Sequence, residues 1–317
     1  MEPELKALIE QLSQAGRRPF WQCTVDDARN APTLVKRLFP DAPSVERTQD
    51  IRISSTRGHA FPARLYVPRD RPCGLIVYLH GGGWVVGSVD DYHPLTATIT
   101  ARSGFAVLSV DYRLAPEHAF PIPLEDARAA LEWASSGSAA VAIGADVNCL
   151  IVMGDSAGAN LATVAARLHN EKNIDRRVDG QVLVYPVTGH DFKTASYDEF
   201  AEGNLLTRND MQWFWDHYCP ERAARANPLA SPLEAEDLSM SPPALVMTAG
   251  RDPLRDEGEA YGARLRKAGV DVAVVRCDGL VHGFLAMIHQ VPGAARAFDR
   301  IVDYITRLGE AVPEARR

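Results

Sequence analysis

Residues 150–158 read Leu-Ile-Val-Met-Gly-Asp-Ser-Ala-Gly, an apolar run that leads directly into a Gly-x-Ser-x-Gly pentapeptide. The apolar run predicts a strand, and the small residues after it predict the start of a helix. A serine at such a sharp turn tends towards positive φ, and the flanking glycines let neighbouring backbone pass close by. This context indicates a nucleophile elbow with Ser156 at its tip. The alternative is a serine that only caps a buried helix.

The same alternation of short β-rich runs and longer helical stretches continues along the chain from about residue 50. It predicts an α/β fold, in which helices flank a mostly parallel, eight-stranded sheet on both faces. The strands are expected at residues 51–55, 64–67, 75–80, 106–110, 150–153, 182–185, 245–249 and 272–276. Helices are expected at residues 124–135, 157–170, 254–268 and 294–308 because apolar residues recur there at three- and four-residue spacing.

Two stretches do not fit this alternation. Residues 1–45 precede the first strand and combine a helix-like leucine spacing with several prolines, which predicts an N-terminal helical cap segment. Residues 46–317 then form the main domain. Residues 188–240 separate two of its strands by far more than a crossover needs, and their middle is unusually aromatic, so we expect a second cap segment inserted there.

A second glycine-rich signal, His-Gly-Gly-Gly-Trp at residues 80–84, ends the third predicted strand. Glycines after a strand let several backbone N–H groups point into one cavity, where they can bind the oxygen of a tetrahedral intermediate. A plain flexible loop or a phosphate cradle is the alternative, but no phosphate-loop lysine motif follows. His80 is expected to order this loop rather than to act as the base.

A serine nucleophile needs a base and an acid that orients the base, and the Gly-x-Ser-x-Gly fold delivers them in the chain order Ser, Asp or Glu, His. Asp252 follows one predicted strand and His282 follows the next, at the sheet edge where active residues of open α/β sheets gather. Asp252 can also be read as a helix N-cap before Pro253. Asp256 is the second choice for the acid.

The composition limits the range of partners. The 317 residues include 34 basic and 41 acidic side chains, a formal net charge of −7, which argues against a nucleic acid or an anionic membrane surface and favours a neutral or small partner. No apolar run is long enough for a membrane span, and the acidic N-terminus does not resemble a signal peptide. Five widely spaced cysteines and the remaining histidines show no disulfide framework and no metal spacing. We therefore expect a cytoplasmic protein with no metal and no cofactor.

The motifs resemble those of the bacterial hormone-sensitive-lipase-like carboxylesterases of the α/β-hydrolase superfamily. Besides residues 80–84 and 154–158, the phrases at residues 110–118, 231–233, 252–258 and 282–284 match the family, and together they cover about residues 45–310. One position departs, because Ala159 stands where the family usually has a glycine. The resemblance implies that Ser156 is the nucleophile, His282 the base, Asp252 its orienting acid, and the N–H groups of Gly82, Gly83 and Ala157 the oxyanion hole.

We therefore expect a serine carboxylesterase that acts on small-molecule esters of short to medium acyl chains through an acyl-enzyme intermediate. An amidase or arylformamidase would use the same triad. A long-chain lipase is another alternative, and so is a non-catalytic receptor of this fold, as in the plant gibberellin receptors that have lost the catalytic histidine. Oligomeric state is left open, with a homodimer as one option. The residues expected to line the substrate pocket are Trp84, Leu205, Leu206, Trp213, Trp215 and Phe284.

Overall fold

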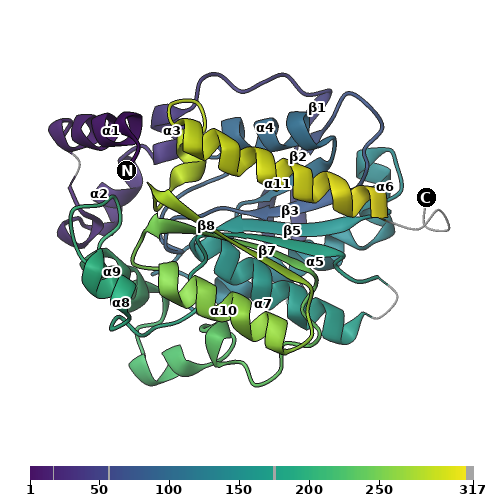
Figure 1. Cartoon of the computed structure of the whole chain (residues 1–317). Helices are drawn as coiled ribbons and strands as arrows, with labels where there is room; N and C mark the ends of the chain where they lie inside the picture. Colours follow the sequence, from purple (N-terminus) through teal and green to yellow (C-terminus); the bar gives the residue numbers. More distant parts are fainter. Residues whose placement is uncertain (17, 56–57, 174–175, 312–317) are drawn as a thin grey trace.

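The computed structural model describes residues 1–16, 18–55, 58–173 and 176–311. These residues form an eight-stranded sheet in the order β1-β2-β4-β3-β5-β6-β7-β8 (Figure 1). The first two strands pair antiparallel, β2 also runs antiparallel to β4, and the strands from β3 to β8 are parallel. The expected α/β architecture and all eight expected strands are confirmed. The strands are β1 (Arg47–Ser54), β2 (Ala60–Val67), β3 (Leu75–Leu79), β4 (Ala106–Val110), β5 (Leu150–Asp155), β6 (Gly180–Val184), β7 (Ala244–Arg251) and β8 (Val272–Val281).

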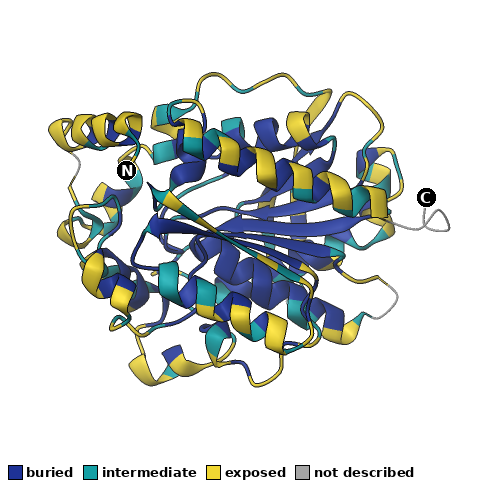
Figure 2. Ribbon diagram, in the orientation of Figure 1, coloured by how far each residue is buried: buried dark blue, intermediate teal, exposed yellow. Residues whose placement is uncertain are grey.

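Helices cover both faces of the sheet. α4 (His93–Ser103) and α11 (Pro292–Ala311) lie on one face, and α5 (Ile122–Ala134), α7 (Ala157–Lys172) and α10 (Arg255–Lys267) lie on the other (Figure 1). Every residue of β3, β4, β5 and β6 is buried, as the dark blue centre of Figure 2 shows. Burial on both faces accounts for the continuous apolar runs from which these strands were predicted.

The sequence pattern did not predict α4. Its run of threonines and isoleucine favours a strand, because β-branched residues lose side-chain freedom in a helix. In the structure the hydroxyls of Thr96, Thr98 and Thr100 each donate to the backbone carbonyl four residues earlier, so the helix satisfies these polar groups itself. The short α6 (Gly137–Ile143) was not predicted either.

The two segments outside the alternation lie together at the carboxyl end of the parallel strands (Figure 1). The backbone N–H of Trp21 donates to Asp210 at 3.1 Å, and the rings of Phe20 and Phe214 are 4.9 Å apart, so the segments contact each other directly. None of the described helices combines the length and apolarity that crossing a bilayer requires. The elements of these segments are α1 (Pro3–Gln14), η1 (Phe20–Gln22), α2 (Val25–Asn30), α3 (Leu34–Leu38), α8 (Ala195–Glu199), α9 (Arg208–Tyr218), η2 (Arg222–Ala226) and η3 (Pro232–Glu234).

Candidate active site

Ser156 stands at the turn between β5 and α7 with φ +54° and ψ −120°. This backbone conformation is strained for a residue with a side chain, and such strain is common at functional turns. A Cβ on Gly158 would lie 2.0 Å from the carbonyl oxygen of Leu79, so only glycine lets the helix start this close to β3. The sharp strand-to-helix turn expected from the sequence is thus present.

Three side chains from three strand ends form one hydrogen-bonded chain. His282, which follows β8, has its Nε2 atom 3.0 Å from Ser156 Oγ and its Nδ1 atom 2.7 Å from Asp252 Oδ2. Asp252 follows β7 and is fully buried, and its other oxygen accepts the N–H of Leu254 at 3.0 Å. The structure therefore brings together the serine, histidine and aspartate that the sequence singled out.

Asp256, the second choice for the acid, faces elsewhere. Its carboxylate accepts the N–H of Ser196 at 2.7 Å and pairs with Arg255 at 2.9 Å, which lowers its pKa. These contacts anchor α8 to α10. The structure thus associates Asp252, and not Asp256, with the imidazole.

The glycine loop after β3 curls beside the serine. Gly83 has φ +59°, and a Cβ there would lie 2.0 Å from the ring of Phe214, so the loop lies tightly under α9. The backbone N–H groups of Gly82, Gly83 and Ala157 donate to no acceptor among the residues that the structure describes. Ala157 is the first residue of α7, where N–H groups lack helical partners and the helix dipole favours an anion.

Asp155, the residue before the serine, is a buried carboxylate that the sequence reasoning did not single out. Its Oδ1 atom accepts the hydroxyl of Tyr78 at 2.7 Å and the N–H of Gly81 at 2.9 Å, while the hydroxyls of Tyr92 and Tyr185 lie 3.5 Å from Oδ2. Burial raises the pKa of this carboxyl. The available signal was an acidic residue in a glycine-rich turn at the end of a buried strand, and this signal does not show the long-range contacts.

His80 lies inside the protein rather than at the cavity. Its ring stacks on Tyr112 at 4.3 Å, its Nδ1 atom is 2.7 Å from the carbonyl oxygen of Gly81, and burial lowers its pKa. The hydroxyl of Tyr112 in turn donates to the carbonyl of His80 at 2.8 Å. These contacts fix the start of the glycine loop, as the expected loop-ordering role requires.

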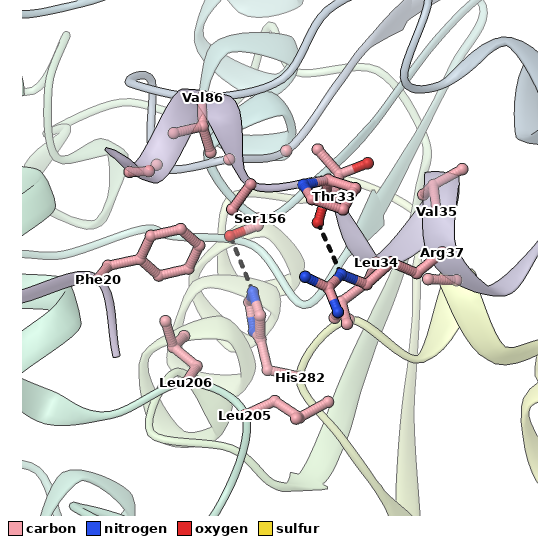
Figure 3. Close-up of a pocket in the computed structure, with 18 of the residues that line it drawn as sticks. Phe20, Thr33, Leu34, Val35, Arg37, Val86, Ser156, Leu205, Leu206 and His282 are labelled. Atoms are coloured by element: carbon pink, nitrogen blue, oxygen red, sulfur yellow. Dashed lines mark hydrogen bonds between the residues drawn. The ribbon is translucent and has the colours of Figure 1, made fainter. Parts of the chain in front are cut away.

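A cavity of about 250 Å³ opens above Ser156 and His282. Both segments outside the alternation contribute to its walls, and Figure 3 shows Phe20 on one side of the serine with Leu206 below it. Of the expected pocket residues, Leu205 and Leu206 line this cavity. Its other apolar lining residues include Phe20, Ala28, Leu34, Val35, Val86, Leu95, Met211, Phe214, Leu285 and Ala286.

The other four expected pocket residues do not line the cavity. Trp84 and Trp215 are fully buried behind it, where Trp84 stacks on Tyr218 at 4.0 Å. Phe284 is buried too, and the half-buried ring of Trp213 packs against His217 at 4.4 Å and stacks on Phe20 at 6.3 Å. For Trp213 the physical reason is helical periodicity, because residues 211 and 214 of α9 share one face and residue 213 points away from it.

Glu257 is a second buried carboxylate near the site. One of its oxygens accepts the N–H groups of Thr188 and Gly189, at 2.7 and 3.1 Å, and so fixes the backbone where the inserted segment leaves β6. Burial, and to a lesser extent the charge of Asp252, raises the pKa of Glu257 to about 8. Among the described residues no cluster of three or more His, Cys, Asp or Glu side chains is arranged to hold a metal ion.

Comparison with known proteins places this site in a family. The family model of the α/β-hydrolase fold matches residues 76–286, a stretch that contains the glycine loop, Ser156, Asp252 and His282. The chain belongs to this α/β-hydrolase family. The resemblance to the hormone-sensitive-lipase-like carboxylesterases is thereby confirmed.

Several similar curated proteins are named for ester hydrolysis. An ethyl acetate hydrolase of Pseudomonas putida is 36% identical over 300 residues, which cover 90% of this chain and 92% of that protein. The carboxylic ester hydrolase LipN of Mycobacterium tuberculosis is 40% identical over 265 residues, covering 80% of this chain and 68% of that protein. The expected enzyme class, a carboxylic ester hydrolase, is confirmed.

Solved structures of esterases superpose on the whole chain. An esterase of Pyrobaculum calidifontis has a TM-score of 0.88 and 36% identity, and the match covers 99% of this chain and all of that one. A thermostable esterase of Pseudomonas putida has a TM-score of 0.89 and 34% identity, with 98% of both chains covered. The likeness therefore includes the segments at residues 1–45 and 188–240 as well as the sheet.

Proposed function

We propose that the protein is a serine carboxylesterase for water-soluble esters whose acyl chains have roughly four to eight carbons. The observation that carries the proposal is the chain of hydrogen bonds from Ser156 through His282 to Asp252 at the base of an apolar cavity. Nucleophile and base within hydrogen-bond reach, with a third group orienting the base, is the arrangement that acyl transfer to a serine needs.

In the first half of the reaction, Ser156 Oγ attacks the ester carbonyl while His282 Nε2 takes the hydroxyl proton. The carbonyl oxygen becomes an oxyanion, which the N–H groups of Gly82, Gly83 and Ala157 stabilise. His282 then passes its proton to the departing alcohol oxygen, and the acyl group remains on Ser156.

In the second half, a water molecule gives a proton to His282 and attacks the acyl-enzyme, and the imidazole returns that proton to Ser156 as the carboxylic acid leaves. Asp252 holds the imidazole in the required tautomer through Nδ1 and offsets its positive charge during both halves. The buried position of Asp252 strengthens this interaction because no water screens it.

We propose that residues 1–45 and 188–240 act together as a cap that limits the length of the substrate. Both segments line the cavity, and they contact each other through Phe20 and Phe214. The cavity of about 250 Å³ is small beside the roughly 300–1,000 Å³ typical of sites for drug-sized ligands, which supports short substrates.

The cytoplasm is the location that we propose. All five cysteines carry free thiols, and burial raises the pKa of Cys149 to about 12 and that of Cys277 to about 11. Burial makes these two thiols unreactive, and five cysteines without a disulfide among them are typical of proteins in a reducing compartment. Fractionation of cells that express the chain tests this location.

The decisive experiment measures kcat/KM for a series of acyl esters from two to sixteen carbons, with Ser156→Ala as the control for enzyme-independent hydrolysis. We expect an optimum within the short to medium range and no activity in the control. An optimum at sixteen carbons with activation at an oil interface would identify a long-chain lipase. Matched ester and amide pairs with the same acyl group separate an esterase from an amidase or arylformamidase, since a higher kcat/KM on the amide would overturn the proposal.

A further inference from the structure

Two arginines at the cavity wall, Arg18 and Arg37, are not used by the ester chemistry. The other titratable side chains there include Asp27, Asp155 and His282. Arg18 and Asp27 pair with each other at 3.4 Å, and Asp155 is engaged by the tyrosine hydroxyl and backbone contacts described above.

Arg37 has no carboxylate partner among the described residues. Its Nε–H donates to the backbone carbonyl of Pro32 at 3.2 Å, which orients the guanidinium and leaves both terminal amino groups for a ligand. Figure 3 shows the guanidinium turned into the cavity, on the side of Ser156 opposite Phe20. The cavity thus has an apolar flank around Phe20 and a cationic flank at α3.

The cationic flank lies beside the catalytic histidine. α3 carries Arg37 and packs on η4 (Phe284–Met287), and the side chain of Leu34 lies 3.1 Å from where a Cβ on Gly283 would stand. Because His282 must hand its proton to the leaving oxygen, the alcohol part of the ester departs on the side of this histidine. Arg37 is therefore placed to meet the alcohol part and not the acyl part.

We infer that Arg37 is a specificity-determining residue that binds a carboxylate on the alcohol portion of the substrate, so that acyl esters of small hydroxy acids are favoured. This inference rests on the proposed esterase function. A planar guanidinium binds carboxylates through two parallel hydrogen bonds. The chain has a net charge of −7 and so repels anions as a whole, and a local cation at the cavity is what lets an anionic ester enter.

The test compares two matched substrates, 4-acetoxybutanoate and its neutral amide 4-acetoxybutanamide, at pH 8 and low salt. The measured quantity is the ratio of their kcat/KM values within each variant. We expect Arg37→Gln to lower this ratio about tenfold and Arg37→Lys to lower it less, since the lysine keeps the charge and loses the planar fork. The wild-type ratio should fall as salt rises from about 0.05 to 0.5 M.

Lys36→Gln is the matched control. It removes the same charge from the neighbouring residue of the same helix, but Lys36 pairs with Asp91 at 3.5 Å and does not line the cavity. This variant should keep the wild-type ratio. An equal loss in Lys36→Gln and Arg37→Gln would show general electrostatic attraction and would overturn a specific site at Arg37.

A second pair, monoethyl succinate and its neutral amide ethyl succinamate, places the carboxylate on the acyl part instead. If Arg37→Gln lowers the ratio for this pair and not for the acetoxy pair, the assignment to the alcohol part is wrong. If the neutral esters are hydrolysed and neither ratio depends on Arg37, the inference fails while the esterase function stands. If the wild type hydrolyses members of the plain acyl series and none of these four esters, the inference also fails, and only inactivity on both sets would overturn the proposed function itself.

Discussion

The backbone N–H of Gly81 donates a hydrogen bond to Asp155 at 2.9 Å, and this bond joins the glycine loop to the turn that carries the nucleophile. The glycine loop after β3 and the nucleophile turn after β5 are thereby held in a fixed position relative to each other. A shift of about 1 Å between a nucleophile and oxyanion donors is enough to cost orders of magnitude in rate. The carboxylate next to the serine is therefore placed to position the oxyanion loop.

Replacing Asp155 with alanine should lower kcat about 100-fold, because the loop loses the acceptor that holds Gly81. Asp155→Asn keeps an acceptor oxygen of the same shape and should lose less. Rates and thermal unfolding are measured on the same preparations, with KM reported separately. If Asp155→Ala lowers the melting temperature but leaves kcat of the folded enzyme unchanged, the residue has no part in positioning the loop.

Ser156→Ala and His282→Ala should each lower kcat by about 10⁴-fold or more, and the double variant should be little worse than either single variant. The reason is that the base has nothing to deprotonate without the serine, and the serine is unactivated without the base. Single-turnover kinetics on a soluble acyl ester measure these losses. Losses that multiply in the double variant would mean that the two residues act independently.

The choice of acid is tested by a pair of conservative changes. Asp252→Asn should be nearly as damaging as loss of the histidine, because the amide favours the wrong imidazole tautomer at Nδ1. Asp256→Asn should have a small effect on kcat, because this carboxylate binds Ser196 and Arg255. The opposite order of severity in steady-state rates would make Asp256 the orienting acid.

The catalytic residues could be predicted from the sequence because their positions follow from the order of the strands along the chain. Ser156, Asp252 and His282 each follow a strand, and parallel strands place their carboxyl ends at one edge whatever the helices do. The residues that line the cavity depend instead on which face of α9 points into it. Phe214 lies on that face and its neighbour Trp213 does not, so a small difference in the orientation of the helix decides which ring reaches the substrate. Asp155 escaped notice because its partners, Tyr78 and Gly81, are about 75 residues away, and no local pattern shows such a contact.

The pH dependence of stability is expected to reflect Glu257. Its pKa is raised to about 8 in the folded protein, while the unfolded chain titrates near the ordinary value of 4.5, so the folded state binds the extra proton between these values. The free energy of unfolding contributed by this group is complete below about pH 4.5 and falls as the pH rises through 8, above which both states are ionised and the contribution no longer changes. In the Glu257→Gln variant the melting temperature should therefore fall less between pH 6 and pH 9 than it does in the wild type. An unchanged slope would show that Glu257 is already ionised at pH 6.

We expect Phe214 to limit the length of the acyl chain, and not Trp213 or Trp215, which do not line the cavity. Phe214 lines the cavity, lies against Gly83 and meets Phe20 at 4.9 Å. Trp213 does not line the cavity, and its ring packs against His217 at 4.4 Å and more distantly on Phe20 at 6.3 Å. Each methylene that still fits the apolar cavity should raise kcat/KM up to about fourfold, the equivalent of ~0.8 kcal/mol, until the chain meets the wall.

Phe214→Ala removes part of that wall, so the optimum of the two- to sixteen-carbon series should move to longer chains, while Trp213→Ala should leave it in place. Truncating a buried phenylalanine also destabilises a protein by about 3–5 kcal/mol, so Phe214→Leu, which opens less space at a smaller cost, is measured in parallel. The two Phe214 variants should shift the optimum in the same direction and in order of the volume removed. A shift in Trp213→Ala with none in either Phe214 variant would mean that the acyl chain runs along a different wall of the cavity.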